Sequence, residues 1–416
     1  MIRAAVRGDM ETIVRIQAGA FQKHYEEDAS RLDRLRENLS RKLAGWLMFE
    51  KDGKTIGCAH VLPQTLRIGK AKIVKGDLGY VAIPPEYQGQ GLGHQLLTEA
   101  LAWMKEQDYD LSRLGGLVKF YRRFGYQRFF RRFLEIKAGI MARAGASMVQ
   151  EGELPMPEVW KKAIRRFSRK KDETSFLAVR SAFQKNYQGS MDVSPKELGV
   201  PGESPLALVF EDKGKIVAYL LGGEYPEEMT EAEARITIGE VGYRRGYEHG
   251  LAAMLLHVHN LALEKGIHRI TVRTPFDPEF IRVLSTTPVR FNLVETYEGA
   301  SGNMLQVVNL RSLIEHLVPE LEARIKGSTW QGTILLQIEK DEVRLAAKGG
   351  RIRVAVRGKG GIKLSIKEFY LMQMVLGMLS FDEIRHLVGG RKLRPRDAAF
   401  LNDLFPRRAV YSGVWG

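Results

Sequence analysis

The spacing of apolar residues divides the first part of the chain into a helix, a strand hairpin, a further strand and a second helix. The hairpin is indicated by two apolar runs within 47–59, which flank a turn at Gly53. The strand-like run "DLGYVAI" (77–83) follows, and apolar residues then recur at helical spacing. The apolar face of this second helix consists of Leu92, Leu96, Leu97, Ala100, Leu101 and Met104. Mixed strand and helix periods predict an α/β or α+β unit.

The same pattern returns about 160 residues later. Three segments recur in the same order, and each has residues identical to those of its counterpart. Residues 20–23 match 182–185, residues 47–59 match 208–220, and residues 87–97 match 246–256. In the second copy the hairpin turn falls at Gly214. Ordered matches at a nearly constant offset indicate a duplicated domain.

The repeat ends near residue 300, and a different pattern follows. The segment "MLQVVNLRSLIEHLVPELEARI" predicts a strand and an amphipathic helix, and strand-like alternation and a further helix come after it. We therefore predict an α+β protein with domains at 1–140, 141–300 and 301–416. Three domains also suit a chain of 416 residues, since one domain usually takes roughly 100–200.

Charge and composition limit the partners. Lysine and arginine number 64 and aspartate and glutamate 49, so the net charge of +15 favours an anionic partner: nucleic acid, a membrane surface or a phosphorylated ligand. The single cysteine, Cys58, excludes an intrachain disulfide, and its apolar surroundings predict a buried structural residue. No signal peptide, membrane span or metal-binding motif is recognisable, so we expect a cytoplasmic protein without metal.

A glycine-rich turn carries the strongest chemical signal. The run "PPEYQGQGLGHQLL" (84–97) leads from a strand into a helix, and such a turn brings backbone amides and a helix N-terminus to an anion. No lysine follows the glycines as a P-loop requires, and a dinucleotide fingerprint fails at His94. The pattern (Q/R)xxGx(G/A) is met by Gln88, Gly91 and Gly93.

Together with "FYRRFGY" (120–126), this run resembles the two signatures of the GNAT acetyltransferase superfamily. The resemblance implies that acetyl-CoA is the co-substrate, with its pantetheine paired along the strand and its pyrophosphate held by loop amides. The implied cofactor-binding residues are Val81, Ala82, Ile83, Gln88, Gly89, Gln90, Gly91, Leu92, Gly93 and His94. Arg122 or Arg123 would add charge near the phosphates.

The same resemblance places Tyr121 as the general acid that protonates the departing thiolate, which suits a phenol because it is protonated at neutral pH. Tyr126 is expected to pack. The second copy has Tyr247 at the position of Gln88, Arg244 and Arg245 at those of Pro85 and Glu86, and Ile281 near that of Tyr121. We expect it to bind no cofactor.

The whole arrangement resembles the Eis (enhanced intracellular survival) family, with two GNAT copies, the second degenerate, and a sterol-carrier-like third domain. That resemblance implies a hexamer, a third domain that walls the substrate pocket, and the C-terminal carboxylate, here on Gly416 after Trp415, as general base. The acceptor would be an aminoglycoside-like amine, a polyamine or a lysine side chain. Glu26, Glu27 and Asp28 either attract that cationic amine or form a solvated acidic cluster.

Two other functions remain open at this stage. The positive charge would suit a nucleic-acid-binding protein, although no nucleic-acid motif is recognisable. The third domain would suit a lipid carrier. We expect an enzyme that binds neither nucleic acid nor membrane.

Overall fold

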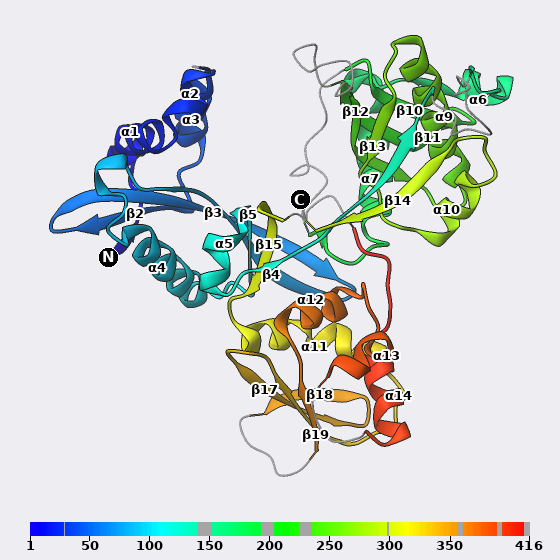
Figure 1. The fold of residues 1–416 in the computed structure, drawn as a ribbon. Coiled ribbons are helices and arrows are strands. Elements are labelled where there is room, and N and C mark those ends of the chain that lie inside the picture. The colour runs from blue at the N-terminus through cyan, green and yellow to red at the C-terminus, as the bar shows by residue number, and fades with distance from the viewer. Residues whose placement is uncertain are drawn as a thin grey trace, which may run out of the picture.

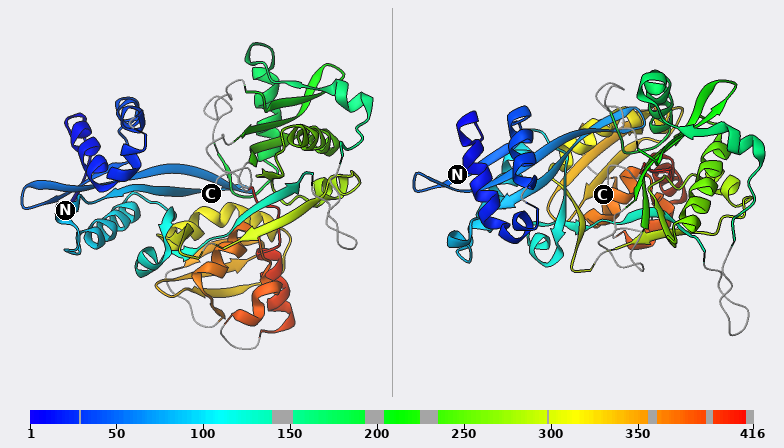
Figure 2. Two further views of the ribbon diagram at one scale, coloured as in Figure 1. Left: turned by 45° about the horizontal axis from the view of Figure 1, so that its top comes forward. Right: turned by 90° about the horizontal axis from the view of Figure 1, so that it is seen from above.

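The computed structural model describes residues 1–28, 30–139, 152–192, 204–224, 235–297, 299–355, 361–388 and 393–411. They form three lobes, each built around one β-sheet (Figure 1). We call these lobes the first, second and third units, with sheets of eight, seven and four strands. The lobes meet near the middle of the molecule (Figure 2).

The first unit has the strand order β1-β2-β3-β4-β5-β15-β6, and β9 pairs with β3. Helices α1 to α3 lie on one side of this sheet and α4 and α5 on the other (Figure 1). Its consecutive elements are β1 (Ile2–Ala4), α1 (Met10–Ala20), α2 (Gln22–Glu26), α3 (Ser30–Arg41), β2 (Trp46–Lys51), β3 (Lys54–Ile68), β4 (Ala71–Ala82), α4 (Leu92–Glu106), β5 (Leu111–Leu117), α5 (Val118–Tyr121) and β6 (Gln127–Arg128).

The second unit has the strand order β14-β7-β13-β12-β11-β10-β8. The elements that follow β6 in the chain are β7 (Arg131–Lys137), α6 (Glu158–Ala163), β8 (Ile164–Arg166), α7 (Arg169–Gln184), β9 (Ser190–Met191), β10 (Ala207–Asp212), β11 (Lys215–Glu224), β12 (Arg235–Tyr243), α9 (Glu248–Glu264), β13 (Arg269–Val272), α10 (Pro278–Leu284) and β14 (Phe291–Thr296).

The third unit has the strand order β18-β17-β16-β19. The last part of the chain forms β15 (Ser301–Val307), α11 (Leu310–Arg324), β16 (Gly332–Gln337), β17 (Glu342–Lys348), β18 (Arg351–Ala355), β19 (Ile362–Ser365), α12 (Glu368–Leu376), α13 (Phe381–Ile384) and α14 (Pro395–Leu404).

The local predictions from the sequence agree with these elements. Five of the six apolar positions in α4 are buried, and Leu101 is half-buried. Both predicted hairpins turn through two residues of positive φ, at 51° and 72° for Asp52 and Gly53 and at 49° and 74° for Lys213 and Gly214. Such pairs form the tight turn that suits the twist of two strands. The elements of the two copies also run in the same order, as the repeat predicts.

The predicted boundaries at residues 140 and 300 do not coincide with the sheets. Strand β7, which we expected in the first domain, lies between β13 and β14 in the second sheet. Strand β15, which we expected in the third domain, lies between β5 and β6 in the first sheet. Local patterns predict that a strand forms, but its neighbours come from distant parts of the chain. Strand β7 therefore joins the first part of the chain to the second sheet, and β15 joins the last part of the chain to the first sheet.

The hairpin of β3 and β4 connects the first unit to both others. Near its tip, Leu66 and Arg67 pair with β9. The backbone amide of Lys70 donates a 2.8 Å hydrogen bond to Glu320 of α11. Apolar residues of the hairpin share one buried core with the third unit, and Leu66, Ile68 and Ile73 are fully buried there. The far end of this hairpin is thus held by contacts with β9 and with the third unit.

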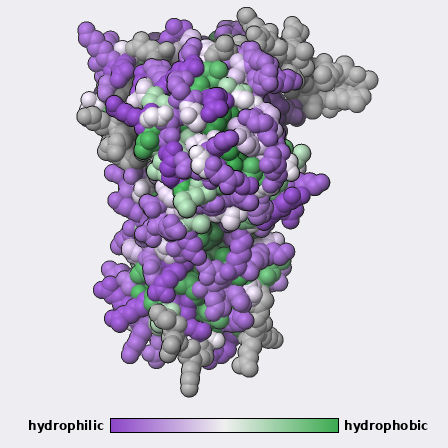
Figure 3. All heavy atoms as spheres, turned by 90° about the vertical axis from the view of Figure 1, so that its left-hand side faces the viewer, coloured by the Kyte–Doolittle hydropathy of each residue, from purple (hydrophilic) through white to green (hydrophobic). Residues whose placement is uncertain are grey.

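The surface at the first unit's end of the molecule is mostly hydrophilic, with small apolar areas between the polar side chains (Figure 3). Among the described residues, no helix is both long and apolar enough to span a membrane.

Candidate active site

Strands β4 and β5 separate near the middle of the first sheet. They pair in parallel from Lys75 to Asp77 with Leu111 to Arg113, and the pairing ends there. Beyond that point β4 continues along β3, and β5 continues along β15. The facing edges of the two strands are left without a strand partner, so an extended ligand can bind between them as a further strand does.

A bulge in β4 accompanies the separation. Between the pairs His60–Gly79 and Cys58–Ala82, β4 contains one more residue than β3. Tyr80 lies in this stretch with a φ of 51°, and its carbonyl accepts a 2.7 Å hydrogen bond from Gln17 Nε2. An extra residue bends a strand and increases its twist. The fully buried Gln17 side chain of α1 therefore holds the bend in place.

The glycine-rich turn follows directly and carries a series of available amides. Gly89 and Gly91 have φ values of 76° and 75°, which favour glycine, and Gly91 is the residue before α4. The amides of Gln88 and His94 donate to the carbonyls of Pro85 and Gly91. Within the described part of the chain, no acceptor is recorded for the amides of residues 89 to 93. Five consecutive amides at a helix N-terminus form a binding site for phosphate.

The side chains in this turn have supporting roles. Gln88 Nε2 donates a 2.8 Å hydrogen bond to the carbonyl of Ile83, which ties the turn to the end of β4. The Leu92 side chain is buried in the core beneath α4, so only its amide is available. Gln90 is exposed and hydrogen-bonded to the Glu86 carbonyl.

A cleft of about 690 Å³ lies between the separated strands and the turn. Nine of the ten predicted cofactor-binding residues line it together with Tyr121, and Gln90 does not. Sequence reasoning missed Phe21, the pair Gly115 and Gly116, Leu117 and Phe120, which also line the cleft. The Gly-Gly pair was the available signal, because adjacent glycines in a strand indicate close approach of another group.

Tyr121 lines the cleft and packs against Gly116. A Cβ on Gly116 would lie 2.4 Å from the Tyr121 ring, so only glycine allows this ring position. The ring also contacts those of Phe120 and Tyr126, with centroids 5.0 and 6.0 Å away. Burial raises the pKa of the Tyr121 phenol above its usual value. The hydroxyl therefore stays protonated at neutral pH, as a proton donor must.

The remaining sequence predictions have mixed outcomes. Tyr126 is fully buried and shares a 2.5 Å hydrogen bond with Ser112, as expected of a packing residue. Cys58 is also fully buried, and burial raises its thiol pKa to about 12, as expected of a structural cysteine. Of the two arginines, Arg123 lines the cleft and Arg122 does not. Gly416 lies outside the described residues.

The acidic cluster after the first helix does not line the cleft. Asp28 is paired with Arg31 and Arg34, and Glu27 approaches Arg31 at 4.0 Å. Glu26 accepts a hydrogen bond from Gln22. These three acidic side chains therefore interact with neighbouring side chains. This arrangement agrees with the second alternative from the sequence, a solvated acidic cluster.

The corresponding turn of the second unit has fewer available amides, and an acidic side chain occupies it. The amide of Gly250, which stands at the position of Gly91, donates to the Tyr247 carbonyl, and the amide of Gly246 donates to the Glu248 carboxylate. Glu248 also places a negative charge in the first turn of α9, where a phosphate would otherwise bind. A bound anion would have to displace this carboxylate.

The described residues contain no group of three or more histidine, cysteine, aspartate or glutamate side chains arranged to hold a metal ion.

Comparison with known proteins points to one family. Residues 1–129 match the acetyltransferase (GNAT) domain family. A Bacillus subtilis protein assigned as a ribosomal protein bS18-alanine N-acetyltransferase is 30% identical over 135 residues, which are 30% of this chain and 82% of that protein.

Solved structures with a similar fold cover the whole chain. A GCN5-related N-acetyltransferase from Anabaena variabilis matches with a TM-score of 0.65 at 16% identity, covering 99% of this chain and 98% of its own. Eis1 from Mycobacterium abscessus matches with a TM-score of 0.62 at 15% identity, covering 100% and 99%. At such identities the likeness concerns the fold alone. From the family match over residues 1–129, the bacterial relative and the cleft between β4 and β5, we conclude that this chain belongs to the GNAT family of N-acetyltransferases.

Proposed function

We propose that this protein transfers an acetyl group from acetyl-CoA to a primary amine. The observation that carries the proposal is the series of five available amides at the start of α4, next to the separated edges of β4 and β5. This combination suits a ligand that has both a pyrophosphate and an extended amide-containing arm.

In this proposal the pantetheine arm lies along Val81, Ala82 and Ile83, and the amides of residues 89 to 93 hold the pyrophosphate. Gln88 positions the turn through its bond to Ile83. Arg123, exposed at the edge of the cleft, adds positive charge near the phosphates. Tyr121 donates its proton to the thiolate of CoA as the amine attacks the thioester carbonyl.

Three apolar side chains at the edge of the cleft suggest how the acceptor is recognised. Phe21, Tyr80 and Leu117 line the cleft and are 41%, 47% and 63% exposed. The acidic cluster at 26–28 lies outside it. We therefore propose an acceptor that presents its amine beside an apolar surface. A panel of amines tested for acetyl-CoA-dependent release of free thiol identifies it, and no release with any amine would contradict the function.

The second and third units have supporting roles in this proposal. The second unit is a degenerate GNAT copy, and the third is the sterol-carrier-like domain of an Eis-like enzyme. In the described part of the chain, no residue after 123 lines the cleft. Any contribution of the third unit to the acceptor site would therefore come from outside the described residues.

We expect one acetyl-CoA to bind per chain. The first unit has five available amides, whereas in the second unit the Glu248 carboxylate occupies the turn and the Gly250 amide donates to the Tyr247 carbonyl. Calorimetric titration of acetyl-CoA should therefore give a stoichiometry of one. Two equivalent sites per chain would show that the second unit also binds the cofactor.

We also propose the carboxylate of Gly416 as the general base. The tail is anchored as far as Tyr411, which is 6% exposed and accepts a 3.1 Å hydrogen bond from Gln184. Its backbone amide donates to the carbonyl of Gln188. A terminal carboxylate has a pKa of about 3.3–3.7 and is ionised at neutral pH.

Adding one residue after Gly416 moves the carboxylate by roughly 3.5 Å. We expect this variant to bind acetyl-CoA normally but to have a kcat lower by about 10²-fold. Steady-state kinetics and calorimetry on the same preparation separate the two effects. Full activity of the extended chain would exclude the carboxylate as the base.

A further inference from the structure

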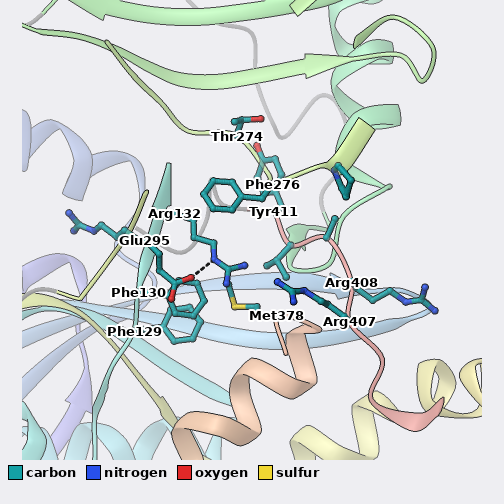
Figure 4. A pocket seen from close by; sticks show the side chains of 14 residues that line it. Phe129, Phe130, Arg132, Thr274, Phe276, Glu295, Met378, Arg407, Arg408 and Tyr411 are labelled. Carbon is teal, nitrogen blue, oxygen red and sulfur yellow. Dashed lines mark hydrogen bonds and ion pairs between the residues drawn. The ribbon is translucent and has the colours of Figure 1, made fainter. Parts of the chain in front are cut away.

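A second cavity, of about 510 Å³, lies where the three units meet. Its walls come from the end of the first unit and β7 (129–132), from the second unit (274–278 and Glu295), and from Met378 and the tail (407–411) (Figure 4). None of its lining residues belongs to the cleft between β4 and β5. The volume is within the range of small-molecule sites.

The guanidinium of Arg132 projects into this cavity and is held in a defined orientation (Figure 4). Its Nε donates a 2.6 Å hydrogen bond to Glu295, the residue that faces Arg132 across β7 and β14. Its central carbon lies 4.8 Å from the ring centroid of Phe130 and 5.6 Å from that of Phe276. A guanidinium in contact with aromatic rings and fixed at Nε presents its two terminal NH2 groups as a fork.

This fork has no recorded acceptor. Among the described residues, the terminal nitrogens of Arg132 donate to none, although the side chain is only 21% exposed. Polar groups that are largely buried are usually hydrogen-bonded, because leaving them without a partner costs free energy. The orientation of Arg132 therefore suits an acceptor that occupies the cavity.

The charge of the walls specifies that acceptor. Four arginines, at 131, 132, 407 and 408, line the cavity, and Glu295 is its one acidic lining residue within the described chain. Glu295 is paired with Arg132 through Nε, Arg407 is paired with Glu383 outside the cavity, and the Arg408 side chain points away from the cavity (Figure 4). The fork of Arg132 is therefore the positive group that favours an anion here.

The other walls are apolar and aromatic. The rings of Phe129 and Phe130 stack with centroids 4.6 Å apart, and both side chains are buried. Met378 and Val410 are also buried where they line the cavity. A ligand that fits these walls has an apolar body that ends in a carboxylate.

We propose that this cavity is a second ligand site, which binds a small organic acid with an aromatic or branched apolar body. The carboxylate accepts two hydrogen bonds from the terminal NH2 groups of Arg132, and the body packs against Phe129, Phe276 and Met378. The cavity shares no lining residue with the cleft between β4 and β5, so a ligand here takes no part in acyl transfer in this proposal. The inference does not depend on the proposed function.

Calorimetric titration of the full chain with 4-phenylbutyrate, in the presence of saturating CoA, tests the proposal. We expect one site per chain and weaker binding as salt increases. The neutral analogue 4-phenylbutan-1-ol has the same body and should bind at least about tenfold more weakly, because it lacks the charge-assisted hydrogen bonds. Binding should also raise the thermal midpoint, since the ligand contacts all three units.

Variants of Arg132 identify the group that binds. Arg132→Met should weaken 4-phenylbutyrate binding at least about tenfold. Arg132→Lys retains the charge and a partner for Glu295 but loses the fork, so we expect an intermediate loss. Arg128→Met is the matched control, because Arg128 is exposed on β6 and does not line the cavity. It should bind as the unchanged protein does.

Several results would overturn the proposal. Equal affinity for the acid and the alcohol would exclude recognition of the carboxylate. Unchanged binding in both Arg132 variants would exclude the fork, and competition by CoA would assign the ligand to the acyl-CoA cleft. Binding seen only after removal of residues 412–416 would assign the cavity to the chain's own terminus.

Discussion

Replacing Tyr121 with phenylalanine is expected to lower kcat by about 10²–10⁴-fold, with little change in the affinity for acetyl-CoA. The substitution removes only the hydroxyl. The ring keeps its place over Gly116 and its contacts with Phe120 and Tyr126, so the cleft keeps its shape. Burial raises the pKa of this phenol, so the unmodified side chain carries its proton throughout the neutral range. Its loss leaves the CoA thiolate without this donor.

Steady-state kinetics on a good amine substrate, with calorimetry of acetyl-CoA, measure the two effects separately. Tyr126→Phe is the matched control from the same motif. It removes the buried hydrogen bond to Ser112 and should lower stability by about 1–3 kcal/mol without a comparable loss of kcat. If the kcat of Tyr121→Phe is within about threefold of that of the unchanged enzyme, Tyr121 is a packing residue and not the general acid.

The sequence predicted the parts of the site that depend on neighbouring residues. The turn at Gly89 and Gly91 and the helix after it follow from local spacing, and both are present. Nine of ten predicted cofactor-binding residues line one cleft because they lie within a single stretch of chain, from the end of β4 to the start of α4.

The features that the sequence did not predict depend on distant partners. Tyr80 carries a positive φ because Gln17 of α1 holds its carbonyl, and nothing near Tyr80 in the sequence indicates this contact. Strands β7 and β15 were expected on the wrong side of their domain boundaries, since their pairing partners are far away in the chain. In the sequence, Arg132 is one of five arginines within residues 122–132, and nothing there indicates its orientation. Its orientation depends on Phe276 and Glu295 of the second unit.

The second large effect is expected at Gly91. Replacing it with glutamate should abolish measurable binding of acetyl-CoA. The residue lies directly before α4 at a φ of 75°, and a side chain there would start beside the five available amides. A carboxylate about 4 Å from a phosphate repels it by about 4 kcal/mol at an effective dielectric constant of about 20, which corresponds to roughly three orders of magnitude in affinity.

Two further variants separate charge from backbone strain. Gly53→Glu introduces the same residue at a φ of 72° in the β2–β3 turn, also with no atom within 4 Å of the new Cβ, and should bind acetyl-CoA normally. Gly91→Gln has nearly the shape of glutamate without its charge, so it should bind more weakly than the unchanged protein but more tightly than Gly91→Glu. Calorimetric titration of the three variants gives the comparison. If Gly91→Glu bound acetyl-CoA as tightly as Gly53→Glu, the amides before α4 would not be the pyrophosphate site, because a fixed negative charge among them could not then be tolerated.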